Sequence, residues 1–146
     1  MSGRNIFLAA PISGFQEKKE YEDYRLMLTN LIAFLRENGH TVYSEIENVY
    51  DDTCYDSPGK SAMDDFSKIS ECDTFLMLHP KRMQTSTFIE LGYACAKSKK
   101  LVIVGDMKDL PYLAQGLEES ERDARIINQS DLNEVVFEWI NDIMME

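Results

Sequence analysis

The residues best suited to chemistry lie in the stretch Thr85 to Ala96, where a loop rich in hydroxyl groups leads into a helix that carries one carboxylate, Glu90. Apolar runs typical of buried strands, 74–78 and 101–104, flank this stretch. Open α/β sheets bind ligands where strand ends lead into helix starts. Burial beside neighbours such as Phe88 raises the pKa of a carboxyl group, whereas the amides of a helix start lower it. Glu90 is therefore either an ordinary solvated charge or a partly desolvated nucleophile of the kind that forms a covalent glycosyl intermediate.

Other groups that could contact a ligand lie near the ends of the first and third strand-like runs. The segment 9–14, Ala-Ala-Pro-Ile-Ser-Gly, has small side chains that let a ligand approach the backbone, and Ser13 can donate a hydrogen bond. His79 either contacts a ligand base or is a solvated strand end, and we favour the second interpretation. Asp64 and Asp65 are helix neighbours whose side chains point about 100° apart, so we expect only one of them to face the ligand.

Neither a metal centre nor a phosphate-binding loop is predicted. Cys54, Cys72 and Cys95 show no Cys-x-x-Cys spacing, and no cluster of His, Cys and carboxylate residues has metal-ligand spacing. The segment 58–61, Pro-Gly-Lys-Ser, resembles the end of a P-loop, but Cys54 stands where that motif needs its first glycine. We expect Cys72 and Cys95 to be small buried side chains.

The composition restricts the partners and the compartment. The 146 residues fit one domain, and 44% hydrophobic with 28% charged residues is typical of a soluble globular protein. A net charge of −11 argues against polymeric nucleic acid but is compatible with a single nucleotide bound by backbone amides. There is no signal-peptide pattern and no run of membrane-spanning length, and the cysteine pattern fits a reducing compartment, so we expect a cytoplasmic protein without a membrane partner.

Strand-like and helix-like segments alternate along the chain. The hydrophobic patterns predict strands at 6–10, 41–44, 74–78, 101–104 and 125–127. They predict helices at 17–37, 60–71, 87–97, 110–119 and 131–145, the last capped by Ser130 or Asp131. Near-continuous apolar strands between helices indicate a single α/β domain with a flavodoxin-like or Rossmann-like three-layer sandwich and a five-stranded parallel sheet of order 2-1-3-4-5. In that order the ligand crevice lies outside the carboxyl ends of strands 1 and 3.

Three stretches resemble the nucleoside 2-deoxyribosyltransferase family, which includes deoxynucleoside 5′-monophosphate N-glycosidases. The first is the opening strand and small-residue loop, 6–14. The second is Asp65, followed eight residues later by Asp73 and an apolar strand. The third is Glu-Leu-Gly-Tyr-Ala at 90–94, followed by 99–104, Lys-Lys-Leu-Val-Ile-Val. Together these stretches span nearly the whole domain in order.

The resemblance implies an enzyme that cleaves or transfers the N-glycosidic bond of a nucleoside or nucleoside 5′-monophosphate. It implies that Glu90 is the nucleophile and that Asp65 helps to protonate the leaving base, so that no metal or organic cofactor is needed. It also implies a homodimer or higher homo-oligomer. The residues expected to bind the substrate are those of the first loop, the third strand end and the loop before the nucleophile: Phe7, Ala10, Pro11, Ser13, Gly14, His79, Gln84, Thr85 and Ser86.

This sequence departs from the family pattern at several positions, which keep two alternatives open. Phe7 stands where the family often has a tyrosine that orients the nucleophile, and Gln84 stands where transferases often have an aspartate. Ser86 or Thr87 replaces the usual loop glycine. One alternative is an NAD glycohydrolase similar to TIR domains, which also place a glutamate on a helix after a hydroxyl-bearing loop. The other is a non-catalytic nucleotide sensor, which Phe7 and Gln84 favour.

Overall fold

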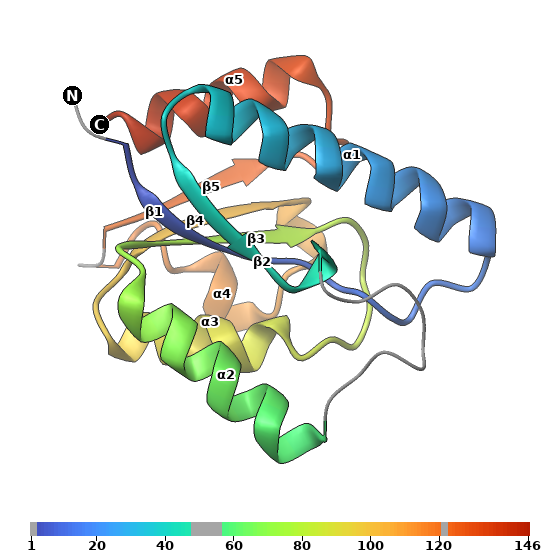
Figure 1. Cartoon of the computed structure of the whole chain (residues 1–146), viewed down its shortest axis with the longest axis horizontal. Coiled ribbons are helices and arrows are strands. Elements are labelled where there is room, and N and C mark those ends of the chain that lie inside the picture. Colours follow the sequence, from blue (N-terminus) through green and yellow to red (C-terminus); the bar gives the residue numbers. More distant parts are fainter. Residues whose placement is uncertain (1–2, 48–56, 121–122) are drawn as a thin grey trace.

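The computed structural model describes residues 3–47, 57–120 and 123–146, and it shows an α/β fold built on a five-stranded parallel sheet (Figure 1). The sheet order is β2-β1-β3-β4-β5, as predicted. The strands are β1 (Asn5–Ala9), β2 (Thr41–Ser44), β3 (Thr74–His79), β4 (Lys100–Gly105) and β5 (Ala124–Asn128). The helices are α1 (Lys18–Glu37), α2 (Pro58–Glu71), α3 (Thr87–Ala96), α4 (Tyr112–Gln115) and α5 (Glu134–Met144), with short 3-10 turns η1 (Glu45–Glu47) and η2 (Met107–Asp109). Cys54 lies outside the described residues.

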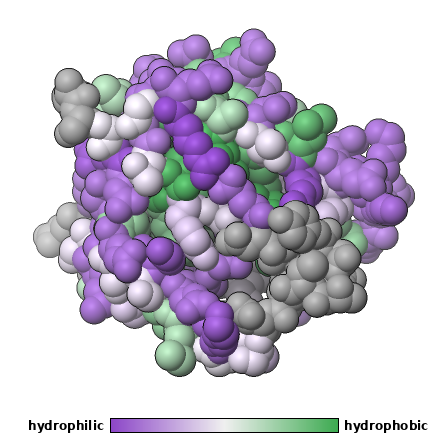
Figure 2. All heavy atoms as spheres, viewed as in Figure 1, coloured by the Kyte–Doolittle hydropathy of each residue, from purple (hydrophilic) through white to green (hydrophobic). Residues whose placement is uncertain are grey.

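The sheet separates two hydrophobic cores. Figure 1 shows α1 and α5 on one face and α2, α3 and α4 on the other. Successive residues of β1 point to opposite faces, so Ile6 packs on the α1/α5 side whereas Phe7 packs on the α2/α3 side. Every residue of β3 and β4 is buried, which explains why the central strands appear in the sequence as continuous apolar runs. Hydrophilic residues cover most of the side of the molecule that Figure 2 shows.

The amino ends of the strands are joined by polar contacts. His40, which is 4% exposed, accepts a hydrogen bond from the backbone amide of Arg4 at 2.9 Å through Nδ1 and contacts Oδ1 of Asn141 at 2.8 Å through Nε2. Asp73 accepts a hydrogen bond from the amide of Asn5 at 3.0 Å. The buried polar groups at this end therefore have partners, and His40 has a structural role there.

Arg4 also holds the two ends of the described chain together. Its Nε donates to the carbonyl oxygen of Met144 at 2.9 Å, and its Nη2 donates to that of Glu146 at 3.0 Å. Figure 1 shows the N and C labels side by side at this end of the sheet. These contacts lie at the amino ends of the strands, so they do not occupy the carboxyl ends, where the strands lead into helices.

The last helix differs from the prediction in its start. Asn133, and not Ser130 or Asp131, caps α5, because its side chain accepts a hydrogen bond from the amide of Val136 at 3.0 Å. The buried face of α5 consists of Val136, Phe137, Ile140 and Met144, whereas Val135 and Trp139 are exposed. The helix predicted at 110–119 is also shorter, since regular α-helix covers only α4.

Candidate active site

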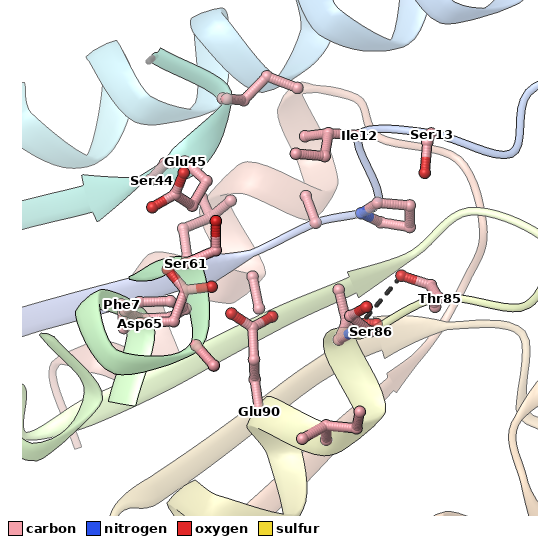
Figure 3. Close-up of a pocket in the computed structure, with 18 of the residues that line it drawn as sticks. Phe7, Ile12, Ser13, Ser44, Glu45, Ser61, Asp65, Thr85, Ser86 and Glu90 are labelled. Carbon is pink, nitrogen blue, oxygen red and sulfur yellow. Dashed lines mark hydrogen bonds between the residues drawn. The ribbon is translucent and has the colours of Figure 1, made fainter. Parts of the chain in front are cut away.

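A cavity of about 330 Å³ opens at the carboxyl ends of β1 and β2, beside the start of α2 and α3 (Figure 3). It lies where the sheet order reverses, which is the place at which open α/β sheets bind ligands. Its volume is within the range of small-molecule sites. The lining residues come from four segments: 7–13, 44–46, the α2 residues Pro58, Ser61, Ala62, Asp65 and Phe66, and Thr85–Thr87 with Ile89 and Glu90.

Most of the residues predicted to form the site meet in this cavity. Both predicted catalytic carboxylates line it, and so do most of the predicted substrate-binding residues: Phe7, Ala10, Pro11, Ser13, Thr85 and Ser86. Gly14, His79 and Gln84 are not among the lining residues. As expected, only one of the adjacent aspartates faces the cavity: Asp65 lines it, whereas Asp64 pairs with Lys60 at 3.1 Å on the exposed side of α2.

His79 is neither a solvated strand end nor a lining residue of this cavity. The side chain is buried, its Nε2 lies 3.1 Å from the carbonyl oxygen of Asp109, and its ring meets the ring of Phe88 edge-on at 5.0 Å. Burial lowers the pKa of His79, which favours the neutral imidazole. Together with Tyr24 it borders a second cavity of about 350 Å³ on the α1 side of the sheet.

Gly14 acts through the backbone of the first loop. It has a φ of +92°, which side-chain-bearing residues rarely adopt, and an added Cβ would lie 2.8 Å from Cε of Met83. The two loops at the carboxyl ends of β1 and β3 therefore pack closely beside the cavity. Gln84 is exposed on the second of these loops.

The loop before α3 sets the position of Glu90. Oγ1 of Thr85 accepts a hydrogen bond from the amide of Thr87 at 3.3 Å, drawn as a dashed line in Figure 3. The carbonyl of Ser86 accepts hydrogen bonds from the amides of Ile89 at 3.0 Å and Glu90 at 3.3 Å, which begins the helix. The hydroxyl of Ser86 makes no capping bond. Glu90 lies in the first turn of α3, and its carboxylate points into the cavity.

Three carboxyl groups from three different elements meet in the cavity: Glu90 from α3, Asp65 from α2 and Glu45 from η1 (Figure 3). Burial raises the pKa of Glu90, and the charge of Asp65 raises it further. Burial also raises the pKa of Asp65, and a hydrogen bond with Glu45 adds to this rise. Carboxyl groups this close titrate as one coupled system, which takes up a proton at a pH where isolated carboxyl groups are ionised.

The ionisable side chains among the described residues of the cavity are all acidic. The described residues that line it include three carboxyl groups but no lysine, arginine or histidine. A site of this kind favours positive charge that develops on a bound molecule, as it does on a sugar ring during glycosidic cleavage. No group of His, Cys, Asp and Glu suited to a metal ion occurs among the described residues.

The described residues also bear on the expectations about membrane spans and cysteines. Residues 3–47, 57–120 and 123–146 contain no helix long and apolar enough to cross a bilayer. Cys72 is buried and Cys95 is partly buried, and both are free thiols, as their apolar surroundings predict.

Glu45 and Ser44 were missed at the sequence level. Both line the cavity, and they follow β2, whose Ser44 pairs in register with Leu8 of β1. The predicted sheet order could have indicated them, because it places the end of strand 2 beside the end of strand 1. Glu45 nevertheless stands at the start of a polar stretch that has the character of an ordinary surface loop.

Comparison with known proteins shows where this architecture recurs. The family described as nucleoside 2-deoxyribosyltransferase matches residues 6–133. The CMP N-glycosidase BcmB of Clostridium botulinum superimposes with a TM-score of 0.68 at 23% identity, covering 94% of this chain and 98% of that one. The solution structure of BlsM gives 0.71 at 18% identity, covering 98% and 90%. A 2-deoxyribosyltransferase from Bacillus psychrosaccharolyticus gives 0.58 at 18% identity, covering 91% and 95%. No curated protein sequence matches the chain.

Proposed function

The chain belongs to the nucleoside 2-deoxyribosyltransferase family, and from this premise we propose that it cleaves or exchanges the N-glycosidic bond of a nucleoside or nucleoside 5′-monophosphate. Glu90 is the nucleophile and Asp65 is its acid–base partner. The observation that carries the proposal is the convergence of these two carboxyl groups, from α3 and α2, in one cavity at the reversal of the sheet order.

The reaction proceeds in two displacements. In the first, a carboxylate oxygen of Glu90 attacks the anomeric carbon, the bond from that carbon to the base nitrogen breaks, and the electron pair leaves with the base. Asp65 gives its proton to the departing base. In the second, water or another base attacks the anomeric carbon, Asp65 takes the proton from the attacking group, and the bond to Glu90 breaks. Both carboxyl groups end in their starting protonation states.

The electrostatics of the site support these roles. Burial, the hydrogen bond with Glu45 and the charge of Asp64 raise the pKa of Asp65, so that it can carry a proton to donate near neutral pH. Positive charge that builds up on the sugar meets an anionic cavity whose described lining holds no basic residue.

The polar groups of the loops suit a sugar or a phosphate. Ser13, Thr85 and Ser86 lie at the cavity beside the start of α3, where hydroxyl and amide donors are available. The names of the structural relatives point to both possibilities, since one is a CMP N-glycosidase and another a 2-deoxyribosyltransferase. We therefore place ribonucleosides, deoxyribonucleosides and their 5′-monophosphates in the candidate substrate class.

We also propose that the chain works as a homodimer or larger homo-oligomer. The rim of the cavity carries an exposed apolar side chain, Ile89 at 65% exposure, and Met63 of α2 is 73% exposed. Analytical ultracentrifugation of the wild-type protein tests this expectation, and a monomer at micromolar concentration contradicts it.

The proposed reaction is tested with a panel of nucleosides, 5′-monophosphates and NAD, with and without a second free base, and with chromatographic detection of the released base. We expect wild type to release base, Glu90→Gln to be silent, and Asp64→Asn, which alters a carboxylate outside the cavity, to remain active. Silence of wild type across the panel would falsify the proposal. Release of nicotinamide from NAD alone favours the TIR-like alternative, and tight binding without turnover that survives Glu90→Gln favours a sensor.

A further inference from the structure

Resting on the function proposed above, we propose that Glu45 is a positioning residue that, held by Tyr43, keeps the proton of the site on Asp65 and leaves Glu90 ionised. Glu45 follows β2 directly, and its carboxylate lines the same cavity as the other two carboxyl groups (Figure 3). Nothing in the family resemblance assigned a role to this residue.

Glu45 is held in place by a fixed donor. The hydroxyl of Tyr43 donates a hydrogen bond to Oε1 of Glu45 at 2.7 Å. The ring of Tyr43 packs against that of Phe7 with centroids 5.5 Å apart, and Nζ of Lys68 lies 5.4 Å from the ring centroid. The Tyr43 hydroxyl therefore uses Glu45 as its acceptor, and this contact fixes the Glu45 side chain at the cavity.

Asp65 needs a proton to satisfy its buried oxygen. Its Oδ1 is buried and finds no hydrogen-bond partner among the donors of the described residues. The groups on either side of it are carboxyl groups, Glu45 and Glu90, which hydrogen-bond to Asp65 only if a proton lies between them. A buried oxygen without such a proton costs about 1–3 kcal/mol. A proton shared between Asp65 and one of these neighbours offsets this cost.

Two arrangements of that proton are possible, and only one is reactive. If Glu90 holds it and donates to Asp65, the nucleophile is neutral and cannot attack. If Asp65 holds it and donates to Glu45, Glu90 remains a carboxylate and the acid is loaded. Glu45, already the acceptor of the Tyr43 hydroxyl, favours the second arrangement, since it offers Asp65 an acceptor other than Glu90.

Titratable groups from four elements interact with Asp65. They are Glu45 of η1, Tyr43 of β2, Asp64 of α2 itself and Glu90 of α3. Burial raises the pKa of Asp65 most, and the hydrogen bond with Glu45 raises it next. The hydrogen bond with Glu90 lowers it, and the charge effects of Glu45 and Asp64 contribute less. Asp64 therefore supplies a matched control: its removal takes away a nearby negative charge without touching the proton-sharing contact.

The first test does not depend on catalysis. In carbon-13 NMR titrations of the side-chain carboxyl groups, Glu45→Gln is expected to lower the titration midpoint of Asp65 by about one unit or more, because the amide donates to the anion and removes a charge. Asp64→Asn is expected to move the midpoint by less than half of that. Equal shifts in the two variants, or no shift in Glu45→Gln, would overturn the proposal whether or not the proposed reaction takes place.

The second test uses base release. Glu45→Gln is expected to lower kcat about tenfold on the pH plateau, to change KM by less than about twofold, and to move the alkaline limb of the pH profile to lower pH. Tyr43→Phe strengthens proton binding by the three carboxyl groups, so it is expected to lower kcat less and to move the limb to higher pH. In an Asp65→Asn background Glu45→Gln should have no further effect. The role assigned to Glu45 would be contradicted by a rise in KM alone, by an unmoved alkaline limb, or by an additive loss of kcat in the Asp65→Asn background. If Glu45→Gln does not fold, the shift of the alkaline limb to higher pH in Tyr43→Phe still tests the proposal.

Discussion

Buried polar side chains have partners at one end of the sheet and lack them at the other. At the amino ends of the strands, the buried polar residues His40, Thr74 and Lys100 all have partners: Arg4 and Asn141, Asp73, and Asp123 respectively. At the carboxyl ends, the buried side-chain atoms that lack a partner among the described residues all belong to residues that line one of the two cavities: Ser44, Asp65 and Thr87 in the first, Tyr24 and His79 in the second.

The buried polar groups that stabilise the fold and those available to a ligand thus lie at opposite ends of one sheet. An unpartnered buried polar group costs free energy, so its presence at a cavity needs a compensating reason such as a ligand or a shared proton. A satisfied group rigidifies the fold and does nothing further. Changes at the amino end are therefore expected to alter unfolding, and changes at the carboxyl end to alter chemistry.

The largest expected effect is at the carboxyl end. Asp65→Asn should reduce kcat for nucleoside cleavage about 100- to 1,000-fold with little change in KM, because the departing base loses its proton donor. The first displacement from a nitrophenyl glycoside of the accepted sugar, whose leaving group needs no proton, should slow much less. Burst kinetics, which time the first displacement, check this with both substrates, and an equal loss in that step would show that Asp65 is not the acid.

At the amino end the corresponding effect is on stability. His40→Ala should lower the free energy of unfolding by about 2–4 kcal/mol, because it removes a buried ring and the partner of both the Arg4 amide and Oδ1 of Asn141. Chemical denaturation measures the loss. The kcat of the folded fraction should stay within about twofold of wild type, and a larger drop would break the separation between the two ends.

A smaller effect, of opposite sign, is expected for Glu90→Gln. Burial raises the pKa values of Glu90 and Asp65 in the folded state, so the stability that the proton held between them contributes is present below the ordinary pKa values and is lost as the pH rises through the raised ones. Wild type should thus lose stability between pH 5 and 9 relative to the variant. At the alkaline end the variant should be more stable by about 1–2 kcal/mol. Denaturation curves across this range test the sign, and parallel curves would contradict it.

The smallest effect is expected at the second cavity. The hydroxyl of Tyr24 is buried without a partner among the described residues, and burial raises its pKa well above the ordinary value. Tyr24→Phe should therefore change the free energy of unfolding by less than about 1 kcal/mol, and in the stabilising direction. A clear loss of stability in thermal unfolding would mean that this hydroxyl has a partner in solution.

The fold was predictable because its determinants are local. Continuous apolar runs such as 101–104 mark strands buried on both faces, and the alternation with helices leaves few topologies for a parallel sheet. The start of α5 was predicted wrongly, since Ser130, Asp131 and Asn133 are all good caps by residue type. The choice among them depends on where the helix meets the sheet, which the local sequence does not contain.

The candidate site was only partly predictable, for the same reason. Glu90 and Asp65 could be singled out by their places beside strand ends and by the family resemblance. The solvated state expected for His79 was wrong because the residue is buried against η2, where it meets the carbonyl of Asp109, 30 residues further along the chain. Glu45 escaped notice because its importance comes from Tyr43 and Asp65, and no spacing rule links these three residues.

The contacts of Arg4 with Met144 and Glu146 also make the connectivity of the chain open to redesign. Because these segments meet at the end of the sheet away from the carboxyl cluster, a short linker between them should close the polypeptide into a ring without disturbing the cavity. New ends could then be opened in the exposed turn after α3, to give a circular permutant. For the same reason, a support or fusion partner attached at this edge leaves the cavity facing solution.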